Sequence, residues 1–208
     1  NADNAIDVAH AERCPLPFLS CMIDDCLKEG KSVQEGGAVY NFTGPQGFGI
    51  ANMADGLFAV RKLVYEDKKV SMKELKEALA WNYDQGLDAQ SAGDIAQLVM
   101  KAMQKAGKNV DASTAETLLR TLIGMKPGEQ KTQRFKEIHD MIDEVPKFGN
   151  DIPEIDYFAR EVAYTYTKPL QNYSNPRGGM FQAGLYPVSA NVPLGGQTGA
   201  TPDGRYSH

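Results

Sequence analysis

The sequence predicts an α/β fold that is rich in helices. Residues 38–43 combine aromatic and β-branched side chains, which is typical of a strand, and a glycine loop follows at 44–49. Helical patterns fill the middle of the chain, and a second strand is expected at 184–191. Strands that alternate with helices indicate an α/β fold. Because two strands alone make a poor sheet, we expect the partner strands to come from other segments.

Apolar spacing predicts the helices. The predicted ranges are 16–28, 50–65, 72–81, 94–105, 113–123, 134–142 and 155–167. Two capping boxes are expected, Ser71 with Glu74 and Ser113 with Glu116. Pro169 should end the last of these helices, because proline cannot continue the hydrogen-bond ladder.

The composition is that of an acidic chain with enough apolar residues for a core. The 208 residues are 42% hydrophobic, with a net charge of −5 and an isoelectric point of about 5.3, which argues against a nucleic-acid partner. Basic residues are densest at 68–69 and 126–136, where a solvated helix face is favoured over a phosphate site. The chain has neither a leader pattern nor an apolar run of about 18 residues, so we expect a cytoplasmic protein without a membrane partner.

The cysteines and histidines offer no assembled catalytic or metal site. An odd number of cysteines, Cys14, Cys21 and Cys26, favours free thiols in a reducing compartment. No histidine stands at zinc-ligand spacing from them, so buried structural thiols are favoured over a metal site. His10 and His139 lie on predicted helices without a carboxylate or nucleophile partner in view, which favours satisfied histidines over acid–base groups.

Two turn-forming segments are candidates for ligand binding. Residues 44–49 read Gly-x-x-Gly-x-Gly before a helix, so a phosphate could bind there. The spacing matches neither a dinucleotide fingerprint nor a Walker loop, and a structural turn is favoured. Residues 201–205 read Thr-Pro-Asp-Gly-Arg, which is typical of a turn. Within it, Asp203 and Arg205 could pair with each other or bind a substrate.

Several motifs together resemble the glycyl radical enzymes of the pyruvate formate-lyase family. They are HAER at 10–13, PLPFLS at 15–20, YNFTGPQGFG at 40–49, ANMAD at 51–55, PKFGND at 146–151, SANVP at 189–193 and TPDGR at 201–205. The sequence YNFTGPQ at 40–46 resembles the dehydratase and lyase branch of the family. That branch includes choline trimethylamine-lyase and the glycerol, propanediol and hydroxyproline dehydratases. The resemblance implies that the chain is part of a ten-stranded α/β barrel. Residues at about 84–144 depart from the family, which has a short connection there, and we expect a helical insertion.

The resemblance also implies radical chemistry on a small organic substrate. In the family a glycyl radical oxidises a cysteine to a thiyl radical, which abstracts hydrogen so that a C–O, C–N or C–C bond is cleaved. The family motifs Gly-Cys-Val-Glu and Arg-Val-x-Gly-Tyr, which hold these groups, do not occur in the 208 residues. We therefore expect a fragment with no catalytic residue, no bound cofactor and no activity alone. The full-length enzyme is expected to be a homodimer, with its radical installed by a radical-SAM activase.

The resemblance places substrate-pocket residues on the strand before Thr201. Tyr186 and Val188 map to that strand and, two residues apart, would share one face of it. A role for both in the core alone is an equal alternative. Thr43 and Gln46 are weaker candidates for the same pocket.

Other functions stay open on the sequence alone. One alternative is pyruvate formate-lyase proper, and another is a truncated, non-catalytic module whose extra helices bind a partner. A third is a nucleotide-binding protein that uses residues 44–49. The substrate cannot be named because most of the pocket would lie elsewhere.

Overall fold

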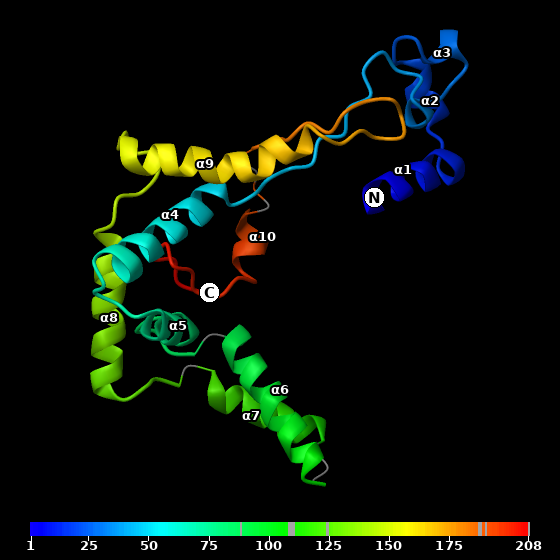
Figure 1. The fold of residues 1–208 in the computed structure, drawn as a ribbon. Helices are drawn as coiled ribbons and strands as arrows, with labels where there is room; N and C mark the ends of the chain where they lie inside the picture. Colours follow the sequence, from blue (N-terminus) through cyan, green and yellow to red (C-terminus); the bar gives the residue numbers. More distant parts are fainter. Residues whose placement is uncertain (88, 108–110, 124, 187–188, 190, 208) are drawn as a thin grey trace. The chain divides into compact units, whose positions relative to one another are not determined.

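The computed structural model describes residues 1–87, 89–107, 111–123, 125–186, 189 and 191–207, and it divides into two compact units (Figure 1). The first unit comprises Asn1–Phe48 and Glu161–Pro187, and the second comprises Gly49–Arg160 and Val188–His208. Among the described residues, no helix is both long and apolar enough to span a bilayer.

The second unit is built from helices. They are α4 (Ile50–Val60), the π-helix η2 (Arg61–Glu66), α5 (Met72–Ala80), α6 (Ala89–Lys105), α7 (Ala112–Leu122), α8 (Glu129–Asp143) and the short α10 (Asn191–Gly195). α9 (Pro153–Leu170) begins here and continues into the first unit. In Figure 1, α6 and α7 lie side by side as a hairpin.

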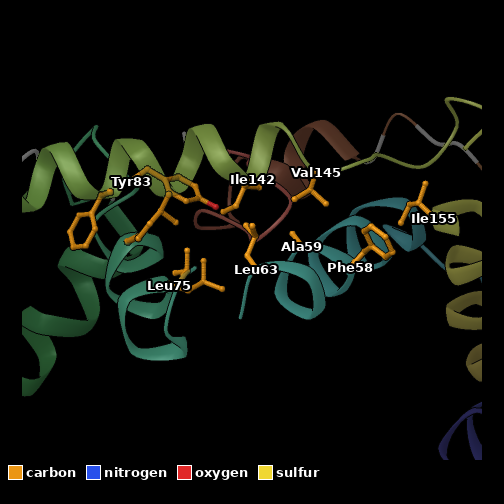
Figure 2. Packing of buried hydrophobic residues seen from close by; sticks show 12 residues of the cluster. Phe58, Ala59, Leu63, Leu75, Tyr83, Ile142, Val145 and Ile155 are labelled. Carbon is orange, nitrogen blue, oxygen red and sulfur yellow. The ribbon is translucent and has the colours of Figure 1, made fainter. Parts of the chain in front are cut away.

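A buried cluster holds the second unit together. Figure 2 shows a row of buried side chains along α8, with Leu75 of α5 near one end and Phe58 of α4 beside Ile155 of α9 at the other. Further members follow the helix ends, such as Tyr83 after α5 and Val145 after α8. The apolar faces of these helices thus pack on one another, as their spacing predicts.

The first unit has short helices and a small buried interior. Its helices are α1 (Ala2–Arg13), α2 (Pro17–Cys21), α3 (Cys26–Glu29) and the 3₁₀ turn η1 (Val33–Glu35). Two extended segments pair in parallel through isolated bridges, Thr43 with Phe181 and Gln46 with Gly184. Many large apolar side chains of this unit are exposed, for example Phe18, Leu27 and Tyr40.

The two predicted strands are wrong in their positions. At 38–43 the Asn41 side-chain amide donates to the carbonyls of Gly36 and Ala38, and these local bonds turn the chain before pairing begins at Thr43. Of the predicted strand 184–191, residues 187, 188 and 190 lie outside the described residues; among the others only Gly184 pairs, and α10 begins at Asn191. The helix-rich character is confirmed, whereas the described residues contain bridges only and no extended strand.

Most predicted helices are confirmed, with three corrections. The range 16–28 is two helices, because Asp25 takes a left-handed φ of 71° between α2 and α3. The N-cap of α7 is Asp111, whose carboxylate accepts from the Thr114 amide, so the expected Ser113 box is wrong. Pro169 lies inside the last turn of α9, which ends one residue later at Leu170. The Ser71–Glu74 capping box is confirmed.

Candidate functional site

The C-terminal turn, residues 201–206, is a closed loop held within the second unit. The Thr201 amide donates to the Arg205 carbonyl at 3.0 Å, and the Gly204 amide donates to the Thr201 carbonyl at 3.1 Å. Gly204 has a φ of +97°, and a Cβ there would lie 2.7 Å from Oδ1 of Asp143. Glycine is therefore required at this position.

Side chains from other elements donate to the outward-facing carbonyls of the turn. The Tyr83 hydroxyl donates to Thr201 at 2.7 Å, and Lys147 Nζ donates to Asp203 at 3.0 Å. Nε2 of His139 lies 2.8 Å from the Gly204 carbonyl oxygen. Asn52 also donates to the Asp203 carboxylate at 2.6 Å. Asn52 belongs to the ANMAD motif and Lys147 to the PKFGND motif, so both of these motifs contact the TPDGR turn.

The charged residues of the turn bind within the chain. Asp203 accepts from Asn52 through Oδ2 and from the Thr201 hydroxyl through Oδ1. Arg205 donates to the carbonyls of Gly195, Thr198 and Gly199, at the end of α10. Asp203 and Arg205 therefore do not pair with each other in any described contact. Both fix the shape of the loop, which favours a structural role over substrate binding.

His139 has the carboxylate partner that the sequence did not reveal. Its Nδ1 lies 3.3 Å from Oδ2 of Asp143, one helical turn away on α8. Its ring stacks on Tyr206 with centroids 4.5 Å apart, and it meets the edge of Tyr83 at 4.8 Å. The expectation of a histidine without a carboxylate partner is wrong, because α8 continues to Asp143, one residue beyond the predicted helix, and so places that carboxylate one turn from His139.

Burial and hydrogen bonds set the protonation of the groups around the turn. Burial raises the pKa of Tyr206 to about 12, and the carboxylate of Asp84, which accepts from its hydroxyl at 2.9 Å, adds to the effect. Burial also raises the pKa of Tyr83 and lowers the pKa of Lys147. Both tyrosines are therefore neutral donors at physiological pH.

In the first unit the glycine loop is part of the parallel pairing. The Thr43 amide donates to the Met180 carbonyl at 3.1 Å, and the Gly47 amide donates to the Gly184 carbonyl at 2.8 Å. A Cβ at Gly47 would come within 2.9 Å of the Tyr166 ring. These contacts favour the structural interpretation of the loop over a phosphate site.

The predicted pocket residues are only partly described. Tyr186 is 59% exposed, and its ring covers Gly184 so closely that a Cβ there would overlap it. Val188 lies outside the described residues. Gln46 is exposed, whereas the Thr43 hydroxyl accepts from Asn175 at 3.0 Å and Arg177 at 2.9 Å. A hollow in this unit is lined by other residues: Thr167, Gln171, Met180, Phe181, Gln182 and Ala183.

The cysteines are all free, and only one is buried. Cys26 is buried beside the turn that starts α3, as expected of a structural thiol. Cys14 and Cys21 are exposed, so the expectation of burial is wrong for them. Within the described ranges no group of three or more histidine, cysteine or acidic side chains could hold a metal ion.

Comparison with known proteins gives consistent matches. The family model described as "Pyruvate formate lyase-like" matches residues 1–195. A relative from Escherichia coli (strain K12), named probable dehydratase YbiW, is 33% identical in an alignment of 195 residues that covers 91% of this chain and 18% of that protein. The curated relatives are thus about five times longer than the part that this chain matches.

Solved structures match more closely. One, described as 1,2-propanediol dehydration in Roseburia inulinivorans, is 61% identical with a TM-score of 0.89, over 100% of this chain and 25% of that chain. The glycerol-bound form of the B12-independent glycerol dehydratase from Clostridium butyricum is 43% identical with a TM-score of 0.70, over 99% of this chain and 20% of that one.

Proposed function

Because the chain belongs to the pyruvate formate lyase-like family, we propose that it is a segment of a glycyl radical dehydratase that removes water from a small vicinal diol. The observation that carries this proposal is the 61% identity, over the whole chain, with the structure on 1,2-propanediol dehydration. The resemblance to glycyl radical enzymes, first inferred from the motifs, is confirmed by the family match and by relatives named dehydratases.

The segment would contribute structure around the reacting groups rather than the groups themselves. Cys14, Cys21 and Cys26 do not stand in the family's thiyl motif, and the radical glycine motif is absent from the 208 residues. We propose that other segments of a longer polypeptide supply both, and that the barrel strands expected from the resemblance come from those segments too. A radical-SAM activase would install the radical on the full-length homodimer.

Tyr186 and Val188 stay the proposed pocket-lining pair. The exposure of Tyr186 within its own unit supports this, because its hydroxyl is free to meet a hydroxylated substrate. Thr43 is a weaker candidate, since its hydroxyl accepts from two side chains of the same unit. The proposed insertion at about 84–144 contains the helices α6, α7 and α8.

A chimaera tests the proposal. The matching quarter of the Roseburia inulinivorans enzyme would be replaced by this chain, and the product activated anaerobically. We expect a glycyl radical signal in electron paramagnetic resonance and consumption of 1,2-propanediol. A chimaera that carries the radical but does not consume the diol would overturn the substrate class.

Variants of the chimaera test the pocket. Tyr186→Phe is expected to raise KM for the diol about tenfold by removing one hydroxyl contact, with the radical signal unchanged. Tyr157→Phe is the matched control, because Tyr157 is also exposed and 61% accessible but lies in the other unit. If both variants behave alike, Tyr186 does not line the pocket. Acetyl transfer from pyruvate would instead favour the pyruvate formate-lyase alternative.

A further inference from the structure

Three consecutive residues after α5 hold the C-terminal segment, residues 201–207, through their side chains. Two of the three are buried, since Asn82 is 7% exposed and Tyr83 is 0% exposed. The bonds reach both ends of the segment. They join Asn82 Oδ1 with the Ser207 amide at 2.8 Å, the Tyr83 hydroxyl with the Thr201 carbonyl at 2.7 Å, and the Asp84 carboxylate with the Tyr206 hydroxyl at 2.9 Å.

The chain that ends α5 has a left-handed backbone at two successive residues. Asn82 has a φ of 50° and Tyr83 has a φ of 54°. The Asn82 amide donates to the Leu79 carbonyl at 3.0 Å, and the next amide along the chain donates to the Ala78 carbonyl at 2.7 Å. This is the Schellman pattern of a helix C-terminus, which needs one left-handed residue and usually has glycine there. The helix end alone therefore explains neither the asparagine nor the second left-handed residue.

The C-terminal segment supplies contacts that keep Tyr83 in its left-handed backbone. A bulky L-residue at positive φ is strained, because its Cβ crowds the following carbonyl. The Tyr83 ring meets Tyr206 edge-on with centroids 5.6 Å apart, and it meets His139 in the same way at 4.8 Å. Tyr206 and Thr201, the partner of the Tyr83 hydroxyl, both belong to the segment. Part of what offsets the strain is therefore present only while the segment is docked.

The asparagine at position 82 serves the segment as well as the helix. Glycine would adopt a φ of 50° with less strain, but it has no side chain that could accept from Ser207. Asparagine enters the left-handed region more readily than most residues and offers an acceptor oxygen. The choice of Asn82 thus follows from the contact with the segment.

We propose that residues 82–84 form a clasp, so that the end of α5 and the C-terminal segment dock and release as one unit. While the segment is docked, its contacts hold Tyr83 in the left-handed region. When the segment leaves, Tyr83 relaxes to a negative φ and the two amide bonds that end α5 open. A strained turn that is held by a docked segment is a two-state element. The clasp lies within the second unit, so its test does not depend on the proposed function.

Native-state hydrogen exchange of the 208-residue chain tests the clasp. If the end of α5 and the segment open together, two amides should have the same protection factor: that of Tyr83, which donates to Ala78, and that of Gly204, which donates to Thr201. This factor should be lower than that of the Ile138 amide in the buried middle of α8, which reports global unfolding. Different factors for Tyr83 and Gly204 would overturn the proposal, and so would a shared factor equal to that of Ile138.

Variants on either side of the clasp should change the protection of both sides. Ser207→Pro removes the amide that Asn82 binds, and we expect the protection factors of Tyr83 and Gly204 to fall together by about tenfold. Ser207→Ala is the matched control, because it keeps that amide and loses only a buried Oγ that has no hydrogen-bond partner among the described residues; both factors should stay unchanged. Asn82→Gly should also lower both factors, although glycine fits the left-handed backbone better. A fall at Gly204 alone, or greater protection in Asn82→Gly, would refute the clasp.

Discussion

The hydroxyl of Tyr83 offers the most direct measure of how strongly the C-terminal turn is tied to the second unit. Tyr83 is 0% exposed, and its hydroxyl donates to the Thr201 carbonyl at 2.7 Å. Tyr83→Phe removes this oxygen but keeps the ring and its edge contact with His139. The change therefore deletes one buried hydrogen bond and creates almost no cavity.

The expected loss of stability depends on the hydrogen bond that the Thr201 carbonyl keeps in the variant. It still accepts from the Gly204 amide at 3.1 Å, so it is not left without a partner. The loss should be that of one net hydrogen bond, about 1 to 1.5 kcal/mol of unfolding free energy. In equilibrium terms this is about a tenfold larger unfolded fraction.

The assay is urea unfolding of the chain followed by circular dichroism at pH 7. Tyr65→Phe is the matched control, because Tyr65 is 66% exposed, and it should change stability by less than about 0.5 kcal/mol. An equal effect of the two variants would refute the reasoning. A loss above about 3 kcal/mol would show that the ring itself has moved.

The pH dependence provides a second check on Tyr83. Burial raises the pKa of the folded-state hydroxyl, whereas an unfolded tyrosine ionises at about pH 10. The unfolded state therefore loses its proton first, and the unchanged chain is destabilised above about pH 10. Phenylalanine cannot ionise, so Tyr83→Phe does not have this alkaline loss. The difference in unfolding free energy between Tyr83→Phe and the unchanged chain should therefore become smaller from pH 9 to pH 11.

Three further predictions use the same unfolding assays. Ser71→Ala removes a capping box at α5 and should lower the unfolding free energy by about 1 kcal/mol, whereas Ser113→Ala, which caps no helix, should have little effect. Phe58→Ala empties a side-chain site that is 1% exposed and should lower the free energy by about 3 to 5 kcal/mol, and a loss below about 1 kcal/mol would contradict its burial. Tyr206→Phe should remove part of the melting-temperature loss between about pH 10 and 12, because the pKa of Tyr206 is raised to about 12 in the folded state; an unchanged alkaline loss would contradict this.

The sequence predicted the helices of the second unit well because their signals are local. The apolar spacing around Leu75 and the Ser71 cap depend on neighbours within one or two turns. The strands were misplaced because pairing depends on distant partners. Tyr40 and Phe42 are strand-forming residues, but the amide of Asn41 between them bonds to nearby carbonyls and turns the chain.

The sequence predicted the C-terminal turn itself but not the side chains that hold it. Pro202 and Gly204 predict a turn from their chemistry alone, and the structure confirms it. The donors that hold it lie more than 50 residues away, as with Lys147, which is 56 residues from Asp203. One signal was available: Asp143 follows His139 by four residues, a spacing that allows an ion pair on a helix, although the predicted helix 134–142 ends one residue before Asp143.

The parallel pairing of the first unit also constrains how the chain is made. The Asn175 side chain donates to the carbonyl of Asn41, 134 residues earlier in the chain. A ribosome that adds about 5 to 20 residues per second would leave the earlier segment without its partner for about 7 to 27 seconds. During that time the exposed side chains of Tyr40 and Phe42 stand next to unpaired backbone. Vectorial synthesis thus makes this stretch a natural place for a chaperone to act.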